Sequence, residues 1–215
     1  MEQLGSAQQS TLSKDIILTD MHLTFYPSYY SGEECERIMS ELCRLDFNSD
    51  EESQVMIRGK YLNIPRKQVA FGDENIRTYR FSGNATPNRE WPQFICDIKK
   101  RLNVMLMEKD IIPQELNYCL VNHYRNGQDY ISYHNDDERD LECAVIVSLS
   151  FGDTRDFLFK HKNTGDVYKL PLCDGDLLII RSPTNTHWKH SLPKRARSKS
   201  SRYNLTFRIM KPIEE

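Results

Sequence analysis

The sequence predicts an α+β fold in which an antiparallel β-barrel or double-sheet jelly roll carries helices on its outside. Three observations predict it. Apolar residues recur near helical spacing at residues 31–45 and 92–108. From about residue 115 onward, the chain changes to short β-rich runs separated by turn residues. No internal repeat and no second domain interrupt this order, and many short strands after two helices favour a single β-rich core.

Size and composition are those of one globular domain. The 215 residues suffice for one sizeable core, and 39% hydrophobic with 28% charged residues is ordinary for a soluble protein. No apolar run approaches the roughly 18 to 20 residues of a membrane span, and the first residues lack the profile of a secretory signal. The six cysteines form no close C-x-x-C pair, so we expect reduced thiols in an intracellular protein rather than a zinc–cysteine site.

The amino-terminal part is expected to contain a polar tail and two helices. Residues 1–18 are rich in polar side chains, show little periodicity and are interpreted as a mobile tail, so that the domain spans residues 19–215. Ser31 provides a start signal for the first helix. In the second helix, Phe94, Ile95, Ile98 and Leu102 fall on one side, as in a helix that packs against a core.

Six β-rich runs follow, and we expect them to form a core at about residues 115–210. They occupy residues 117–124, 144–151, 156–162, 166–172, 176–182 and 202–210. Between the two helices, a strand-turn-strand pattern at residues 55–72 has Arg58, Gly59 and Lys60 at its tip, and a further extended piece lies at 78–83. Both are expected outside the barrel, as a lid at about residues 50–90 over its mouth.

His134 and Asp136 form an H-x-D pair just after a strand-like segment. Residues i and i+2 of an extended chain point to the same side, so both side chains can bind one metal ion. A third ligand must come from a distant strand, and His187 and His190 are both candidates. Two histidines and one carboxylate leave coordination positions open, which suits iron(II) and oxygen chemistry. Alone, the triplet is weak evidence, because such triplets are common without a metal.

The last β-rich run indicates an anion site. Four polar side chains, each two residues from the next, share one face of this strand: Arg202, Asn204, Thr206 and Arg208. Arginines that point into a barrel are costly unless a charged ligand pairs with them. A dicarboxylate fits, because guanidinium binds carboxylate bidentately. An exposed edge strand with its polar face in water is the alternative. Asn122 and Tyr124 also share a strand face, either as donors to the same ligand or as ordinary half-buried residues.

Charge is unevenly distributed, although the formal net charge is only −2. From His187 to Arg208 there is no acidic residue, whereas lysines and arginines recur throughout. A basic stretch on a near-neutral protein can neutralise phosphates. A solvated loop is the alternative interpretation.

Taken together, these residues resemble the AlkB family of oxidative nucleic-acid dealkylases. The matching motifs are N-x-Y (Asn122, Tyr124), H-x-D (His134, Asp136), the histidine of H-S-L-P (His190) and R-Y-N-L-T-F-R (residues 202–208). Their order and separation are more specific than any single motif, and the likeness runs from about residue 55 to residue 210. Further stretches, among them I-P-R-K-Q (64–68) and T-Y-R-F-S-G (78–83), resemble the animal branch of the family that repairs double-stranded DNA.

The resemblance implies a double-stranded β-helix (jelly-roll) core with amino-terminal helices and a nucleotide-recognition hairpin as its lid. It implies Fe(II), 2-oxoglutarate and O2 as cofactor and co-substrates, with His134, Asp136 and His190 as the catalytic metal ligands. Arg202 would hold the distal carboxylate of 2-oxoglutarate. The residues implied to complete that pocket are Asn122, Tyr124, Asn204 and Arg208. The implied reaction oxidises the N-alkyl carbon of lesions such as 1-methyladenine and 3-methylcytosine in DNA, and it yields succinate, CO2 and formaldehyde.

The resemblance also implies base flipping, because these alkyl groups lie on the pairing edge of the base. The residues implied to contact the substrate are Arg66, Tyr79, Phe81, Ser82, Glu138, Lys194, Arg195 and Arg197. Phe81 and the ring of His134 would sandwich the flipped base, and Glu138 would contact its exocyclic group. Arg66 would lie close to the pocket, and the last three residues would follow the phosphate backbone. On their own, Tyr79 and Phe81 would be read as ordinary core residues.

One departure from the family concerns the hairpin tip. The duplex-repairing relative carries an aromatic wedge there, which fills the gap left by the flipped base, whereas residues 56–59 read Met-Ile-Arg-Gly here. Ile57 can still act as a wedge, as aliphatic side chains do in other DNA-bending proteins. Arg58 can stack through its planar guanidinium or bind phosphate. Duplex and single-stranded substrates therefore both stay open.

We expect a monomeric dioxygenase that demethylates alkylated DNA and makes no contact with a membrane. RNA demethylation by the same core is one alternative. A catalytically silent nucleic-acid-binding module is another, and the complete set of ligands argues against it. The run K-R-A-R-S-K (194–199) and the resemblance together indicate a nuclear, otherwise cytoplasmic, location.

Overall fold

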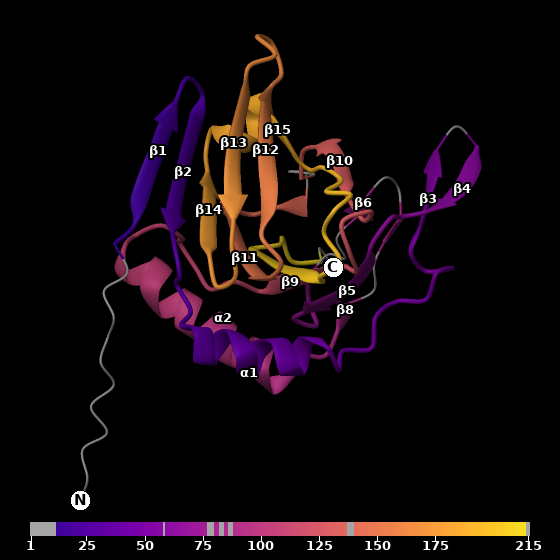
Figure 1. The fold of residues 1–215 in the computed structure, drawn as a ribbon. Helices are drawn as coiled ribbons and strands as arrows, with labels where there is room; N and C mark the ends of the chain where they lie inside the picture. Colours follow the sequence, from indigo (N-terminus) through magenta and orange to yellow (C-terminus); the bar gives the residue numbers. More distant parts are fainter. Residues whose placement is uncertain are drawn as a thin grey trace, which may run out of the picture.

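The computed structural model describes residues 12–57, 59–76, 80–81, 84–85, 88–136 and 140–213. These residues form two larger sheets, almost entirely antiparallel, with two long helices on the outside (Figure 1). This arrangement confirms the expected β-rich core with external helices. None of the helices in these ranges is long and apolar enough to cross a membrane.

The major sheet has eight strands, and the last strand in sequence lies in its middle. In spatial order they are β1 (Lys14–Leu18), β2 (Met21–Tyr26), β14 (Leu177–Arg181), β11 (Ile146–Gly152), β16 (Arg202–Arg208), β9 (Tyr118–Tyr124), β5 (Lys67–Gly72) and β8 (Asn88–Arg89). Neighbouring strands are antiparallel except for the short β5–β8 pair.

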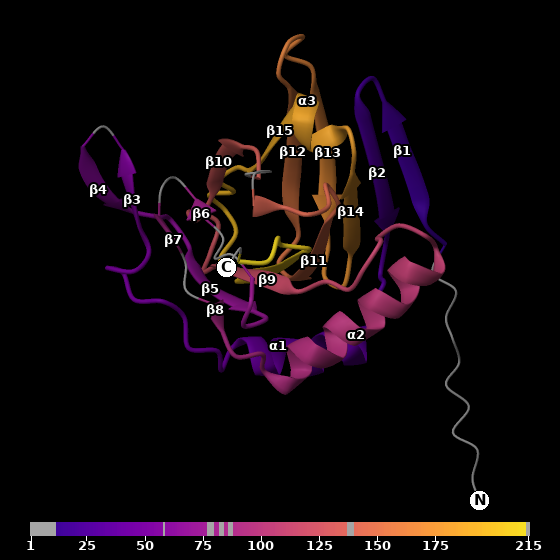
Figure 2. The same ribbon diagram turned by 180° about the vertical axis from the view of Figure 1, so that it is seen from behind.

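The minor sheet faces the major sheet across the interior (Figure 2). Its strands, in spatial order, are β10 (Ile131–His134), β15 (Trp188–Leu192), β12 (Arg155–His161) and β13 (Val167–Leu172). The short helix α3 (Thr184–His187) leads directly into β15. Two small hairpins complete the described structure: β3 (Gln54–Ile57) with β4 (Lys60–Asn63), and β6 (Arg80–Phe81) with β7 (Asn84–Ala85).

Helices α1 (Gly32–Leu42) and α2 (Gln93–Glu108) cover the outer face of the major sheet (Figures 1 and 2). Ser31 caps α1 through a capping box with Glu34, which satisfies backbone N–H groups that the helix leaves without a partner. Leu102 of α2 is fully buried with Leu205 of the sheet in one core cluster. Both helices therefore begin where the sequence predicts them.

Alternation along the strands separates an apolar outer face from a mixed inner face. In β16, Tyr203, Leu205 and Phe207 belong to the core beneath the helices. The residues between them point to the inside, between the two sheets. There a second core cluster includes Phe157 and Phe159 of β12. Polar side chains on the inner face of β16 are therefore buried in the barrel.

The amino-terminal tail is shorter than predicted. Residues 14–18 were expected in the mobile tail, but they form β1, which pairs with β2 from Lys14↔Phe25 to Leu18↔Met21. Ile16 is the residue of β1 that packs against the interior core, while the other side chains of this strand are exposed. An edge strand held mainly by backbone hydrogen bonds leaves little apolar pattern in the sequence.

The expected lid is also smaller than predicted. Residues 67–72 were expected outside the barrel, but they form β5, which pairs with β9 within the major sheet. Val69 and Phe71 of β5 are buried beneath the helices, and this apolar face ties the strand to the core. Hairpin β3–β4 does stand out from the body of the protein (Figures 1 and 2).

Candidate active site

Strands β10 and β15 bring together two histidines that are far apart in sequence. His134 and His190 are direct cross-strand partners, and their ring centroids lie 4.3 Å apart. Nδ1 of His134 lies 2.8 Å from the carbonyl oxygen of Ser132. Because a carbonyl oxygen only accepts, Nδ1 of His134 carries the hydrogen and its Nε2 keeps a lone pair for a metal.

Asp136 follows β10 and is buried beside these two rings. Asn185 holds the aspartate backbone from both sides: its Oδ1 accepts from the Asp136 N–H at 3.3 Å, and its Nδ2 donates to the Asp136 carbonyl at 3.2 Å. Nη2 of Arg208 donates to Oδ2 of Asp136 at 2.9 Å. One ligand atom each from His134, Asp136 and His190 lie within 4.8 Å of one another, as a metal site requires.

The surroundings keep all three groups in the form that binds a metal. Burial, together with neighbouring His190, lowers the pKa of His134 to about 3. Burial also lowers the pKa of His190. Burial alone would raise the pKa of Asp136, but the charge of Arg208 holds it well below its usual range. At neutral pH the triad therefore presents two neutral imidazoles and a carboxylate.

A cavity opens at this triad between the two sheets, with about 600 Å³ of space free of atoms, its mouth included. Besides the triad, its polar lining consists of Arg66, Gln68, Asn122, Tyr124, Ser148, Asn204, Thr206 and Arg208. Its apolar lining consists of Leu120, Ile131, Ile146, Phe157 and Ile180. Since β16 lies between β11 and β9 in the middle of a sheet, the alternative of an exposed edge strand is wrong.

The polar lining is held in place by hydrogen bonds among its own members. Nε of Arg66 donates to Oδ1 of Asn122 at 2.8 Å. Nδ2 of Asn204 donates to Oγ of Ser148 at 2.8 Å, and its Oδ1 accepts from Thr206 at 3.0 Å. Such mutual bonds orient the side chains before any ligand arrives, which lowers the entropic cost of binding.

Arg202 is buried behind the cavity and is not among its lining residues. One guanidinium nitrogen donates to Oγ of Ser150 at 2.8 Å, and the guanidinium carbon lies 5.6 Å from the centre of the Tyr124 ring. Nε of Arg202 is buried and has no hydrogen-bond partner among the described residues. Burial lowers the pKa of Arg202 to about 10. A buried guanidinium that is incompletely paired favours an anionic ligand nearby.

The predicted substrate contacts are only partly within the described structure. Arg66 lines the cavity, whereas Lys194, Arg195 and Arg197 are exposed on the surface. Arg58, Tyr79, Ser82 and Glu138 lie outside the described residues. For Ile57 in β3 and Phe81 in β6, the strand is described but the side chain is not.

The basic segment at residues 194–199 is anchored to the loop after β9. The N–H of Arg195 donates to the carbonyl of Gly127 at 2.7 Å, and its guanidinium donates to the carbonyl of Thr154. Nζ of Lys194 lies 5.1 Å from the centre of the Tyr130 ring. The segment therefore has a defined position beside the cavity-forming strands, and Arg195 also helps to hold it there.

Two residues with structural roles at the site were missed. Arg155 is fully buried in β12, and one nitrogen of its guanidinium donates to the carbonyls of Asp129 and Pro193 at 2.9 and 2.7 Å. Arg155 lies two residues before the apolar Phe157 and so on the same face of the strand, and this spacing could have predicted that Arg155 is buried. Asn185, which braces Asp136, follows a turn, and no periodic pattern in the sequence marks it.

The positions of His187 and His190 distinguish the two candidates for the third metal ligand. His190 lies with His134 and Asp136, whereas His187 belongs to a different cluster with Asp20 and His161. Because β15 runs from residue 188 to residue 192, only His190 is carried into the interior by the strand.

Comparison with known proteins agrees with this geometry. A family model described as the 2OG-Fe(II) oxygenase superfamily matches residues 22–208. The DNA oxidative demethylase ALKBH2 of Bos taurus is 36% identical over 197 residues, which cover 87% of this chain and 68% of the relative. ALKBH2 of Homo sapiens is 36% identical over 193 residues, covering 85% and 71%. The alpha-ketoglutarate-dependent dioxygenase alkB homolog 3 of Homo sapiens is 32% identical over 197 residues, covering 87% and 65%.

A solved structure described as "The structure of OsALKBH1" matches with a TM-score of 0.57 and 19% sequence identity. The match covers 91% of this chain and 100% of the other. At this level of identity the likeness concerns the fold, and it supports the predicted jelly-roll architecture.

Proposed function

This chain belongs to the 2OG-Fe(II) oxygenase superfamily and depends on Fe(II), 2-oxoglutarate and O2, and we propose that it demethylates alkylated bases in DNA. Relatives that are 36% identical over most of the chain are named DNA oxidative demethylases. The single observation that carries the proposal is the His134–Asp136–His190 triad at a cavity with a guanidinium, that of Arg208, in its wall. Metal-binding groups and carboxylate-binding groups meet there.

The triad is proposed as the iron site. Two imidazoles and one carboxylate, gathered within 4.8 Å, are the donors that leave coordination positions open for oxygen chemistry. When bound with its co-substrates, the iron supplies an oxidant able to attack a C–H bond. The chain's own part is positional: the carbonyl of Ser132 orients the ring of His134, and Asn185 braces the backbone of Asp136.

Arg202 and Arg208 are proposed to divide the binding of 2-oxoglutarate and the support of the metal. Arg208 contacts Oδ2 of Asp136 and lines the cavity, so it acts next to the metal ligands. Arg202 is buried on the same face of β16, at the opposite end of the strand from Arg208. It is proposed to bind the distal carboxylate of 2-oxoglutarate. Asn122, Tyr124 and Asn204 would complete the pocket, and the apolar side chains of the lining would exclude water from it.

The proposed lesions are 1-methyladenine and 3-methylcytosine, whose alkyl groups disrupt base pairing. A base that no longer pairs is cheaper to rotate out of the helix and into a cavity. Lys194 and Arg197 are exposed in a segment that is bonded to the loop after β9, which supports a role for this segment in binding phosphates. With DNA as the substrate we propose a nuclear location, and a monomer is sufficient because all the proposed ligands come from one chain.

The chemistry is tested by release of succinate and formaldehyde from a methylated oligonucleotide in the presence of Fe(II). We expect His190→Ala to abolish both products and to lose metal binding measured by calorimetry. His22→Gln is the matched control, because His22 lies outside the cavity and should leave turnover unchanged. Full turnover by His190→Ala would disprove the iron assignment, and absence of product from the unmodified protein would favour a silent binding module.

Substrate choice is tested separately, by comparing methylated single-stranded DNA, duplex DNA and RNA at one stated salt concentration. Salt must be held constant because phosphate contacts make the affinity salt-dependent. Higher kcat/KM on either form of DNA than on RNA supports the proposal. Preference for RNA would overturn the proposed substrate without affecting the iron chemistry.

A further inference from the structure

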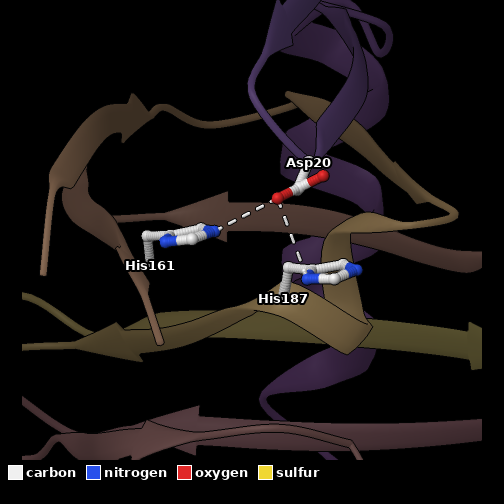
Figure 3. A group of neighbouring side chains, drawn as sticks. All are labelled: Asp20, His161 and His187. Carbon is white, nitrogen blue, oxygen red and sulfur yellow. Dashed lines mark ion pairs between the residues drawn. The ribbon is translucent and has the colours of Figure 1, made fainter. Parts of the chain in front are cut away.

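A second cluster of metal-binding side chains lies at the far end of the β12–β15 pair, away from the cavity. Asp20 lies in the turn between β1 and β2, His161 ends β12, and His187 ends α3 (Figure 3). Oδ2 of Asp20 is 3.4 Å from Nε2 of His161 and 3.8 Å from Nδ1 of His187. All three ligand atoms lie within 4.8 Å of one another, and the aspartate oxygen points between the two rings (Figure 3).

His161 supplies an independent sign that this cluster binds a ligand. Its side chain is only 6% exposed, and its buried Nε2 has no hydrogen-bond partner among the described residues. That nitrogen faces Asp20 and His187. Its contact with Oδ2 of Asp20 is an ion pair and not a hydrogen bond, and a buried nitrogen without a hydrogen bond favours a ligand or ion that would bind it.

The other ring nitrogen of His161 can be held in the state that metal binding requires. Nδ1 lies 3.1 Å from Oγ1 of Thr164, whose hydroxyl lies 2.6 Å from Oδ2 of Asp166. With the hydrogen on Nδ1 donated to Oγ1, and the Thr164 hydroxyl hydrogen donated to Asp166, Nε2 keeps a lone pair directed at the cluster. A ligating histidine usually donates its other ring N–H to an acceptor such as a carboxylate, a backbone carbonyl or water, and the hydroxyl oxygen of Thr164 can take that place. The backbone N–H of Thr164 donates to Nδ1 at 3.1 Å, and this bond belongs to the tautomer with its hydrogen on Nε2. Metal binding would therefore shift His161 to the other tautomer and lose this bond.

We propose that Asp20, His161 and His187 form a second metal site, suited to Zn²⁺ or a similar divalent transition metal ion with water as its fourth ligand. Zinc bonds to nitrogen and oxygen of about 2.0–2.1 Å in tetrahedral geometry place ligand atoms roughly 3.3 Å apart. The separations of 3.4 and 3.8 Å need only a small adjustment. Asp20 and His187 have side chains that are 41% and 39% exposed, which leaves a face open for the water.

The ligands are already held in place by contacts around them. The indole N–H of Trp188 donates to the carbonyl of Thr19 at 3.1 Å, and the N–H of Lys162 donates to the carbonyl of His187 at 2.9 Å. These bonds fix the residues next to Asp20, His161 and His187. The metal would therefore clamp the β1–β2 turn of the major sheet to β12 and β15 of the minor sheet. Its role would be structural, at the end of the strand that carries His190.

The test uses Co²⁺ as a probe on chelator-treated protein, because four-coordinate Co²⁺ absorbs visible light much more strongly than six-coordinate Co²⁺. The background is His134→Ala/His190→Ala, which removes the proposed iron site. We expect this variant to bind one equivalent of Co²⁺ with a strong visible spectrum, and Zn²⁺ to displace it. At a hundredfold excess over Kd, Zn²⁺ should raise Tm by on the order of 5–10 °C.

Asp20→Asn, added to the same background, should lose the spectrum and the rise in Tm. Asparagine is chosen because residue 20 has φ 57°, a conformation that asparagine adopts readily. Asp15→Asn in the same hairpin is the matched control and should bind Co²⁺ as the parent does. If the double alanine background does not fold, the unmodified chain should bind two equivalents and Asp20→Asn one. Absence of the second equivalent, or its persistence in Asp20→Asn, would show that the cluster is only a set of ion pairs.

Discussion

At the residue scale, the two arginines of β16 have the same burial but different partners. Arg208 donates to Asp136 beside the proposed iron, while Arg202 donates to Ser150 and keeps a buried Nε without a partner among the described residues. Alternation alone predicted that the two arginines share one face of this strand, and it left open whether that face lies inside the barrel or in water. It did not predict the different partners, because they depend on which strands of the sheet lie alongside.

We expect Arg202→Lys to weaken the binding of 2-oxoglutarate and to leave the affinity for the metal unchanged. Lysine keeps the charge but loses the planar, bidentate donor pair, so the KM for 2-oxoglutarate should rise about 10- to 100-fold, on the order of 1.4–2.8 kcal/mol. Succinate release measures this KM, and calorimetry with Mn²⁺ measures the metal affinity. Arg208→Lys, by contrast, should weaken both. Identical behaviour of the two variants would contradict the proposed division.

The contacts of Asp129 predict how its contribution to the stability of the fold depends on pH. Its carboxylate accepts from the backbone N–H, Nε and Nη2 of Arg125 at 2.9, 2.7 and 2.9 Å. Burial alone would raise the pKa of Asp129, but these hydrogen bonds and the charge of Arg125 lower it. The folded-state pKa therefore lies below the unfolded value of about 3.9. The stabilisation is complete above that value and is lost as the pH falls through the folded-state pKa.

Asp129→Asn should lower the free energy of unfolding by about 1–2 kcal/mol at pH 7, a modest loss because Arg125 is half exposed and its charge is screened. Below about pH 4, the difference from the unmodified protein should shrink. Urea unfolding at pH 7 and pH 3.5 measures both. Asp50→Asn, which removes an exposed partner of Lys67, is the control and should change little at either pH. A difference that does not depend on pH would mean that packing, not charge, is responsible.

At the scale of elements, the loop after β9 and the basic segment after β15 approach each other closely at Gly127. A Cβ there would lie 1.8 Å from the carbonyl oxygen of Arg195, and backbone bonds join Gly127 to Arg195 and Ser198 at 2.7 and 3.1 Å. The atoms that this Cβ would meet are backbone atoms of Arg195 and Ser198, so no side chain can rotate away to make room. Glycine is required at this position for the basic segment to lie where it does.

Gly127→Ala should therefore displace the basic segment and weaken DNA binding at least several-fold. Fluorescence anisotropy at one salt concentration measures the affinity. Metal and 2-oxoglutarate binding should persist, because the cavity residues are not involved. Gly32→Ala, where nothing lies within 4 Å of the added Cβ, is the control. Unchanged affinity in Gly127→Ala would exclude a role for this segment in binding DNA.

Hairpin β3–β4 is expected to decide which form of DNA is used. Replacing Ile57 and Arg58 with alanine should lower the rate on duplex DNA that contains 1-methyladenine and leave the rate on single-stranded DNA unchanged, because a wedge is needed only where a base leaves a stack. Formaldehyde release on the two substrates measures this ratio. Equal duplex rates for the variant and the unmodified protein would exclude the wedge. Tyr61→Ala, on the neighbouring strand β4, tests whether exposed apolar area alone has the same effect.

The elements that could be predicted from the sequence are those with a strong local pattern. The first helix could be placed from Ser31 and its apolar spacing, and β16 from the regular alternation along residues 202–208. Strand β1 could not, because its stability comes from backbone pairing with β2. Strand β15 could not either: it is short and its buried residues include His190 and Ser191, which carry no apolar alternation.

At the scale of the whole molecule, the sequence indicates candidate site residues more readily than the way in which they assemble. Each motif could be identified because its chemistry requires particular residue types at a particular spacing. Which histidine completes the triad depends on the pairing of β10 with β15, a contact between distant segments. The same holds for the cluster at Asp20, which joins three elements that no local pattern connects.

Ligand binding should stabilise the whole fold, because the cavity draws its lining from both sheets. Under anaerobic conditions with Mn²⁺, 2-oxoglutarate at a hundredfold excess over Kd should add about 2.7 kcal/mol of stability. This corresponds to a rise in Tm on the order of 5–10 °C. Glutarate, which lacks the keto oxygen, is the control and should give a smaller rise at the same concentration, because its Kd should be higher. An equal rise with glutarate would argue against contact between the metal and the keto group.

The central position of β16 in the major sheet has a consequence for folding during synthesis on the ribosome. Without residues 202–208, the strands β1, β2, β14 and β11 have no strand that joins them to β9, β5 and β8. Pairing between segments so distant in sequence is slow to form. The cavity, which needs residues of β16 in its wall, therefore closes last. A growing chain that lacks residues 202–208 should therefore hold the three proposed metal ligands without the arginines proposed to support the metal and bind the co-substrate, and it should not yet carry out the oxidation.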